Sequence, residues 1–466
     1  MKSMTAEQRN HMLLCDPVSS VIPKMAVPTI ISMLITNIYN MADTFFVSQI
    51  GTSASGAVGV IFSAMAIIQA ISFMIGMGSG THVSQALGAG NKKKADTYAS
   101  TAFFTAFIAG IILAFFSLTH IDFIVRFLGS TETIAPYAKD YATYIFYAMP
   151  FMMCSFVMNN LLRFEGLTMY GMVGITTGGI LNMVLDPILI FALNMGTAGA
   201  ALATALSQGV SFIILLVMCN TKEDAISIKF SNFKPSLQIY GSICYNGIPS
   251  LGRQGIASVS TILLNNAAGV YGDAAIAAMS IVSRYTMFIN SSVIGFGQGF
   301  QPVCGAAFGA KQTARCQTAY RFCQRVLLVF SLAVGAAVFA FAPALTARFA
   351  HDAQTADVAG RALRLQSAVF FAQSAVILMT MLTQSLGQTV RAALVATSRQ
   401  GLFLLPLLTL LPRVFGLWGL LACQSVSDVI SLVFSWLLTR KVFPLSPFTR
   451  SSSPRGGDNR PQTAEG

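Results

Sequence analysis

Charged residues are scarce in this sequence. Asp, Glu, Lys and Arg together make up 10% of its 466 residues, whereas a soluble domain carries roughly 25%. Hydrophobic residues make up 54% of the chain, and the mean hydropathy is +0.66. The composition therefore argues against a water-soluble domain and predicts a polytopic membrane protein.

Recognisable catalytic and nucleotide-binding motifs are missing as well. The sequence has no HExxH, no GxSxG and no Walker loop, and its four histidines are scattered near predicted helix ends or loops. Gly76, Gly78 and Gly80 imitate a nucleotide loop, but they lie in an apolar segment without a preceding strand, where small residues favour close helix packing. We expect no enzyme and no cofactor. If the chain transports a substrate, it must draw on an ion gradient, because it has no ATP site.

Paired cysteines and a cleavable leader are absent too. None of the eight cysteines forms a CxxC pair, and most lie within or beside apolar segments, so we expect packing roles without metal or disulfide. Residues 1–24 contain no long apolar run that ends in a small-residue cleavage site. The first apolar segment is therefore expected to act as the insertion signal.

Long apolar runs, in contrast, are abundant. A helix needs about 20 apolar residues to cross a bilayer core of about 30 Å. The pattern also repeats, because Pro28 recurs as Pro249 and Gly88 as Gly309, each displaced by 221 positions. Since each copy holds an even number of spans, we predict an all-α membrane protein of twelve helices in two parallel six-helix lobes. The twelve stretches begin near residues 26, 57, 99, 138, 169, 198, 243, 274, 323, 369, 392 and 418.

The two copies are joined by a segment of mixed charge. We place the N-terminal lobe at residues 1–220, a cytoplasmic linker at 221–235 and the C-terminal lobe at 236–441. Residues 442–466 are rich in Pro, Ser, Arg and Gly, too polar to bury a core, and we expect a disordered cytoplasmic tail there.

Basic residues are distributed unevenly over the predicted loops. The net charge of +12 could suggest nucleic acid as a partner, but the segregation by loop favours the positive-inside bias of membrane proteins. We therefore expect a plasma (inner) membrane protein that binds no nucleic acid and has both termini in the cytoplasm. One side carries the basic residues of segments 1–24, 92–94, 163, 222–234, 311–325, 391–399 and the tail from 440, and the other only Arg126, Lys139, Arg348, Arg361, Arg364 and Arg413.

Three carboxylates lie well within the predicted spans: Asp43, Asp186 and Asp428. Acidic groups in a bilayer are costly, and burial favours the protonated form, so such groups can exchange a proton or capture a cation. Asn182 lies one helical turn before Asp186, and Pro187 leaves a backbone carbonyl free to help hold an ion. We favour an ion or proton site for Asp43 and Asp186, with a structural carboxylate capped by Asn or Ser as the alternative, and a structural role for Asp428.

Arg253 and Arg284 are the only basic side chains deep in the predicted spans. Each could bind an anionic substrate group, pair with Asp428 or extend its charge to the membrane interface. We favour pairing or an interfacial position, and we retain Arg253, Arg284 and Asp428 as possible cavity residues.

Six runs of the sequence form a recognisable set that spans almost the whole chain. They are 28–51 (PTIISMLITNIYNMADTFFVSQIG), 88–95 (GAGNKKKA), 159–166 (NNLLRFEG), 181–187 (LNMVLDP), 295–311 (GFGQGFQPVCGAAFGAK) and 398–406 (SRQGLFLLP). These runs resemble the multidrug and toxin extrusion (MATE) exporters, in particular the bacterial branch close to the staphylococcal-type multidrug exporters. The resemblance implies a V of two six-helix lobes around a central cavity.

The resemblance also implies roles for individual residues. Asp43 corresponds to the first-helix aspartate used for cation or proton coupling, and Asn182 with Asp186 to the fifth-helix pair of that site. Thr204 resembles the sixth-helix partner, and Pro28 the proline at which the first helix bends. Either Asn159 or Asn160 would be the fourth-helix asparagine. Some relatives carry carboxylates in helices seven and ten, and their absence here leaves the role of the C-terminal lobe open.

We therefore predict a cation-coupled antiporter that exports lipophilic, often cationic, drugs and toxic compounds by alternating access, as a monomer in the lipid bilayer. The coupling ion is H⁺ or Na⁺, with a possible Na⁺ at Asp43 and Asp186. The alternative is a flippase or exporter of lipid-linked precursors or other endogenous metabolites, which a strongly cationic cavity would favour. An intramembrane enzyme or a passive channel is a more remote reading.

Overall fold

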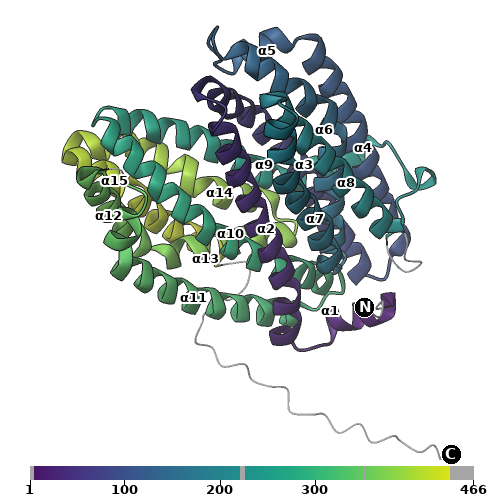
Figure 1. Ribbon diagram of the computed structural model, residues 1–466. Coiled ribbons are helices and arrows are strands. Elements are labelled where there is room, and N and C mark those ends of the chain that lie inside the picture. Colours follow the sequence, from purple (N-terminus) through teal and green to yellow (C-terminus); the bar gives the residue numbers. More distant parts are fainter. Residues whose placement is uncertain (1–4, 221–225, 351, 441–466) are drawn as a thin grey trace, which may run out of the picture.

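The computed structural model describes residues 5–220, 226–350 and 352–440, and these residues form helices and connecting turns only (Figure 1). The tail expected at 442–466 lies outside the described residues. The helices before the linker are α1 (Ala6–Leu14), α2 (Val18–Ser48), α3 (Thr52–Gly88), α4 (Lys92–Thr119), α5 (Ile121–Phe127), α6 (Ala135–Phe164), α7 (Thr168–Pro187), the π-helix η1 (Ile188–Ala192) and α8 (Gly196–Asn220). Those after it are the 3₁₀-helix η2 (Phe230–Asn232), α9 (Leu237–Gly269), α10 (Asp273–Gly309), α11 (Thr313–Ala347), α12 (Ala353–Ser367), α13 (Phe370–Ser385), α14 (Thr389–Thr397), the π-helix η3 (Ser398–Leu402) and α15 (Leu404–Thr439).

Eight helical segments of the described chain are long and apolar enough to cross a membrane, and the pair α12 and α13, bent by 53°, brings the number to nine. Helices α9 and α10 are as long as these segments but more polar, and we count them as two further crossings. Among their polar residues are Arg253 and Gln298, which line a pocket described below. The 51-residue segment Thr389–Thr439, formed by α14, η3 and α15, is long enough for two crossings. Gly416 divides it, with a φ of 56°, a value that favours glycine. The described residues thus contain the twelve predicted crossings.

The twelve crossings divide into two groups of six. In Figure 1 the group from α2 to α8 (purple through blue to teal) lies on one side and the group from α9 to α15 (teal through green to yellow) on the other. The groups meet along α2, α3, α9 and α10. This arrangement confirms the predicted all-α fold of two parallel six-helix lobes.

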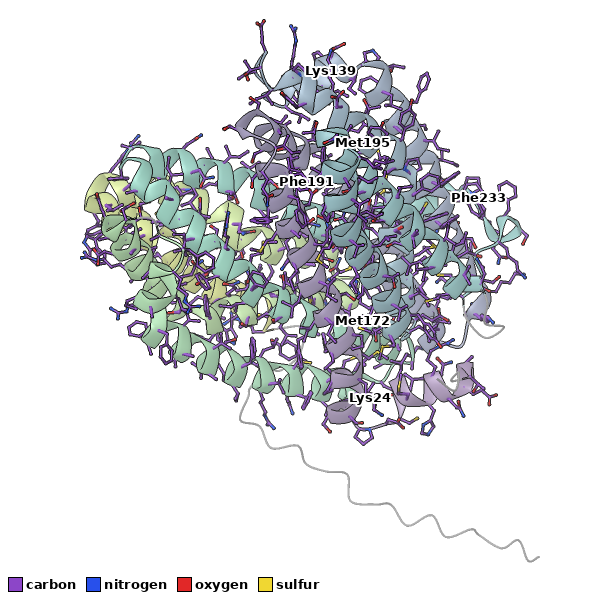
Figure 2. The ribbon with its side chains drawn as sticks, in the orientation of Figure 1. Lys24, Lys139, Met172, Phe191, Met195 and Phe233 are labelled. Carbon is purple, nitrogen blue, oxygen red and sulfur yellow. The ribbon has the colours of Figure 1, made fainter. Side chains whose placement is uncertain are left out.

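The two groups are packed tightly near the C-terminal ends of α3 and α10. The Ser84 hydroxyl donates a hydrogen bond to the Pro302 carbonyl at 3.1 Å, and the Gln85 amide donates one to the Ser385 carbonyl at 2.9 Å. Figure 2 labels Lys24 at this end of the molecule and Lys139 at the opposite end. The two lobes are therefore in contact at the end that bears Lys24, and we call it the closed end.

A short helix that the sequence did not predict covers this closed end. Helix α1 begins with a capping box at Thr5, and its Arg9 forms a buried ion pair with Glu165 at 3.0 Å. At its other end the Arg315 guanidinium donates hydrogen bonds to the carbonyls of Leu13 at 2.8 Å and Asp16 at 2.7 Å. Because Glu165 and Arg315 belong to different lobes, α1 links the two lobes.

Candidate functional site

Asp43 and Asp186 are both buried in the first lobe, beside Tyr141, and we call their surroundings the aspartate chamber. Asp43 on α2 is 8% exposed, and Asp186 at the end of α7 is fully buried. The Tyr141 hydroxyl on α6 donates a hydrogen bond to Asp43 Oδ2 at 3.3 Å, and the charges of both carboxylates act on that hydroxyl. Asp43 and Asp186 therefore face a shared space and not the lipid.

Asn182 and Thr204 complete this chamber. The Asn182 amide nitrogen donates hydrogen bonds to Asp186 Oδ1 at 3.3 Å and to the Thr204 hydroxyl at 3.2 Å. Four of the predicted site residues, on three different helices, are thus gathered in one place: Asp43, Asn182, Asp186 and Thr204.

Three hydrogen-bond acceptors of the chamber have no donor. Asp43 Oδ1, Asp186 Oδ2 and Asn182 Oδ1 are buried, and none has a hydrogen-bond partner among the described residues. A cavity of about 20 Å³ lies against Asn182 and Thr204, which is room for about one water-sized particle. Buried oxygen atoms of this kind are stabilised by a proton or by a hard cation such as Na⁺.

The local backbone explains how Asp186 comes to lie at a helix break. Pro187 ends α7, and the chain continues as the π-helix Ile188–Ala192. Proline cannot donate the backbone hydrogen bond that would continue the helix, and single π-turns are frequent at functional sites. The Asp186–Pro187 step therefore widens the helix next to the chamber.

Three further predicted site residues lie elsewhere. Asn160 donates to the Phe156 carbonyl at 2.7 Å and accepts from Arg163 at 2.6 Å, whereas Asn159 lines a neighbouring pocket. Among the described residues neither asparagine forms a hydrogen bond with Asp43 or Asp186. Pro28 is buried within α2, and its carbonyl accepts a hydrogen bond from Ser32 at 2.9 Å.

The neighbouring pocket lies between the two lobes. It has a volume of about 180 Å³ and is lined by α2, α3, α6 and α7 from the first lobe and by α9 and α10 from the second. It shares Thr36, Phe156 and Ile175 with the small cavity beside Asn182 and Thr204. Arg163 and Arg253 also line this pocket.

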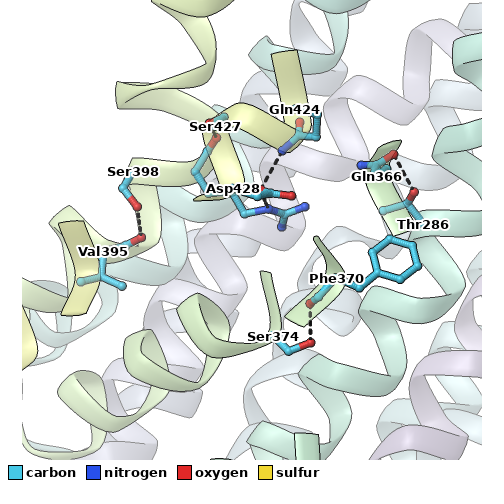
Figure 3. A network of polar contacts seen from close by, with 10 residues as sticks. Thr286, Gln366, Phe370, Ser374, Val395, Ser398, Gln424, Ser427 and Asp428 are labelled. Atoms are coloured by element: carbon cyan, nitrogen blue, oxygen red, sulfur yellow. Dashed lines mark hydrogen bonds and ion pairs between the residues drawn. The ribbon is translucent and has the colours of Figure 1, made fainter. Parts of the chain in front are cut away.

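The structure corrects the prediction for the basic residues. Asp428 pairs with Arg399 at 2.6 Å and not with Arg253 or Arg284, and Gln424 adds a hydrogen bond to it at 3.1 Å (Figure 3). Arg284 is exposed and lines a separate pocket beside Tyr285 and Phe349.

The expectation that Arg253 and Arg284 are the only deep basic residues is also wrong. Arg163 lies buried in the last turn of α6, and Arg399 lies buried in η3. Both helices continue past the apolar run that the sequence shows, which is why counting apolar residues assigned these arginines to loops. A structural role for Asp428 agrees with its buried ion pair.

Tyr141 is a site residue that the sequence did not indicate. It lies in a stretch with several other aromatic residues, including Tyr144 and Tyr147, and nothing in the stretch distinguishes it. Only the packing of α6 against α3 and α8 selects it, because the other two tyrosines are less buried.

Comparison with known proteins identifies the relatives of this chain. A family model described as MatE matches residues 28–188 and again residues 249–410, which together are more than half of the chain. The two matches repeat the duplication seen in the sequence. The multidrug export protein MepA of Staphylococcus haemolyticus is 25% identical over 422 residues, which are 90% of this chain and 93% of that protein.

Two solved structures are similar over almost the whole chain. One is the outward-facing conformation of a multidrug resistance MATE family transporter of the MOP superfamily, with a TM-score of 0.88 and 26% identity over 95% of this chain and 98% of the other. The second is a MOP superfamily transporter from Pyrococcus furiosus in which the reverse polarity of the binding pocket suggests a different function. Its TM-score is 0.87 and its identity 25%, again over 95% of this chain and 98% of that one.

Proposed function

This chain belongs to the MatE family, and we propose that it exports lipophilic small molecules in exchange for a cation, H⁺ or Na⁺, by alternating access. As a member of that family it is a membrane transporter and not an enzyme. The proposal of drug efflux draws on relatives that are named multidrug export proteins. The cation coupling draws on the aspartate chamber.

One observation carries the coupling: the chamber holds two carboxylates and three buried oxygen atoms without hydrogen-bond partners among the described residues. A bound cation or proton satisfies these oxygen atoms, and its departure leaves two negative charges close together in a low-dielectric space. The charge state of Asp43 and Asp186 therefore sets how α2 and α7 pack. Since α2 also lines the pocket between the lobes, loading the chamber changes that pocket.

Alternating access requires a second state in which the closed end opens. In the structure the lobes touch at the end that bears Lys24, and the chain is similar to a transporter in its outward-facing conformation. We propose that this end faces the cytoplasm of the plasma membrane, that both termini lie there, and that Pro28 is the bending point of α2. The lobes, residues 1–220 and 236–441, would then move as two bodies within a monomer.

The test is efflux from proteoliposomes under pH and sodium gradients that are imposed separately. We expect one of the two gradients to drive efflux of a lipophilic dye, and the Asp43→Asn and Asp186→Asn variants to lose at least nine tenths of that rate. Asp140→Asn is the matched control, because Asp140 is exposed on α6. Normal gradient-driven efflux by Asp43→Asn would reject the coupling.

A further inference from the structure

The pocket between the lobes is positively charged. Arg163 reaches it from α6 of the first lobe and Arg253 from α9 of the second. None of the described residues that line it is Asp or Glu. Two positive charges in a confined space of low polarity repel one another, and an anion placed between them removes that repulsion.

Neither arginine is neutralised by an acidic partner in the described part of the chain. One Arg163 amino group donates to Asn160 at 2.6 Å and lies 2.8 Å from the Met77 sulfur, both uncharged. Asp428, the buried carboxylate that the sequence offered as a partner of Arg253, is already paired with Arg399. The charge of Arg253 and Arg163 is thus available to a ligand.

The pocket also has donors without acceptors. Arg163 is 3% exposed and Gln298 is 2% exposed, and both line the pocket. Arg163 Nε and Gln298 Nε2 are buried N–H groups for which the described residues offer no acceptor. A buried donor that lacks an acceptor is costly, and an anionic oxygen is its strongest partner.

The adjoining aspartate chamber shows the opposite deficit, since its unpartnered atoms include the carboxylate and amide oxygens of Asp43, Asn182 and Asp186. The small cavity beside Asn182 and Thr204, which belongs to this chamber, shares Thr36, Phe156 and Ile175 with the pocket between the lobes. The first space holds unpartnered acceptors and suits a cation, whereas the pocket between the lobes holds unpartnered donors and suits an anion.

The remaining walls of the pocket are apolar or uncharged. Phe73, Phe156 and Met172 supply apolar surface, and Asn37 donates a hydrogen bond to Ser291 at 2.7 Å at the pocket's edge. A ligand with an apolar body and one negatively charged head fits this combination, because the head binds the guanidinium groups and the body covers the aromatic wall.

We propose that the pocket between the lobes binds an amphipathic anion, with a carboxylate, sulfonate or phosphate head held between Arg163 and Arg253 and by the Gln298 amide. This assignment rests on the proposed export function and names its substrate class, in place of the lipophilic cations expected from the sequence. Because the two arginines belong to different lobes, the site is complete only while the lobes are in contact at the closed end, which bears Lys24.

The experiment measures binding without any gradient, so that it is independent of transport. The full-length protein in phosphatidylcholine nanodiscs is titrated with dansylglycine and with the same dansyl fluorophore carrying a trimethylammonium group. We expect the anion to bind at least tenfold more tightly than the cation. We expect Arg253→Gln to weaken the anion at least tenfold, Arg253→Lys to weaken it less, and neither change to weaken the cation.

Arg284→Gln is the control, because Arg284 is a cationic residue of the same lobe that lines a different pocket. Arg253→Gln is chosen over an Arg163 variant because Arg163 also packs on Phe164 at 5.1 Å and supports α6. An unchanged elution volume and melting temperature verify that the variant folds. Equal or tighter binding of the cation to the wild type, or an unchanged anion affinity in Arg253→Gln, would overturn the assignment.

Two further arms separate the possible origins of the ligand and the two proposals. Competition of dansylglycine by dihexanoyl phosphatidic acid but not by octanoate assigns the site to a lipid phosphate, and the reverse assigns it to a soluble anion. The Asp43→Asn variant should still bind dansylglycine while losing gradient-driven efflux. Binding without gradient-driven efflux in the wild type would reject the export function and leave the anion site intact.

Discussion

Gly88 and Gly309 make reciprocal contacts across the interface between the two lobes. A Cβ atom at Gly88 would collide with the Ala306 carbonyl, and a Cβ atom at Gly309 would collide with the Gln85 carbonyl. Gly88 and Gly309 are equivalent positions of the repeat, and so are Gln85 and Ala306, all at the displacement of 221 positions. The contacts at the closed end are thus arranged with local twofold symmetry, and a side chain does not fit at positions 88 and 309.

Substitution of Gly88 by Ala should open this end. Overpacking of a close contact costs about 1–3 kcal/mol, and here the cost falls only on the state in which α3 touches α10. We expect Gly88→Ala and Gly309→Ala to shift the population toward the state open at this end. Spin labels on the ends of α3 and α10, with distances measured in nanodiscs, should report a longer separation than in the wild type.

Gly59→Ala is the control for this shift, because nothing lies within 4 Å of a Cβ atom at Gly59 on the same helix. If Gly88→Ala left the distance distribution as it is in the wild type, the contact would not determine closure. A shift of the same size in Gly59→Ala would also contradict the prediction.

Removal of the Tyr141 hydroxyl should weaken coupling. This hydroxyl donates a hydrogen bond to Asp43, and a hydrogen bond to a charged group contributes about 1.5–3 kcal/mol. We expect Tyr141→Phe to lower gradient-driven efflux at least tenfold while dansylglycine binding is retained. Tyr147→Phe on the same helix serves as the comparison, since Tyr147 is 63% exposed. Equal rates for the two variants would show that the hydroxyl plays no part.

The duplicated fold could be predicted from the sequence because apolar length and the spacing of small residues determine it. Asp43, Asn182 and Asp186 were also predictable, since a polar residue within an apolar run is conspicuous, whereas Thr204 was expected only from the family resemblance. Tyr141 and Arg399 were not, because an aromatic residue or a cation at the edge of an apolar run has several possible surroundings. Only the packing of distant helices decides which surroundings it has.

The ion pair of Arg399 and Asp428 should stabilise the second lobe only as a pair. Both side chains are buried at a separation of 2.6 Å, and removal of one partner leaves a buried charge at a cost of about 3–5 kcal/mol. We expect Asp428→Asn to lower the melting temperature in detergent strongly, and Asp428→Asn with Arg399→Gln to recover most of the loss.

The exposed pair of Asp357 and Arg361, with atoms 2.7 Å apart, provides the comparison, because surface ion pairs contribute about 0–1 kcal/mol. Asp357→Asn should therefore change the melting temperature little. A double variant of the buried pair that is less stable than Asp428→Asn alone would show that the pair is not isolated.

Attachment of α1 should depend on pH. Burial raises the pKa of Glu165 to about 7, although Arg9 and the Ile226 N–H both lower it. With α1 released, Glu165 is exposed and its pKa returns to about 4.3. Between these values the attached state binds more protons, so attachment is favoured at low pH and weakens as the pH rises through 7.

A spin label on Glu7→Cys, in a background without the exposed Cys15 and Cys244, measures this attachment. Its mobility should increase between pH 6 and pH 8, and Glu165→Gln should remove the dependence. A pH dependence that persists in Glu165→Gln would assign the titration to another group.

The charge of the substrate determines whether transport responds to the membrane potential. Export of a monoanion in exchange for one inward H⁺ or Na⁺ moves two charge equivalents, whereas exchange of a monocation for one cation moves none. One charge crossing 100 mV corresponds to about 2.3 kcal/mol, so the anion exchange gains roughly 4.6 kcal/mol at that potential. With the ion gradient held fixed and the potential set by potassium and valinomycin, the flux of dansylglycine should therefore rise steeply with potential. The flux of the trimethylammonium analogue, where it is measurable, should not respond. A dansylglycine flux that is independent of the potential would contradict export of an anion by one-for-one exchange, because no other charge moves in that cycle.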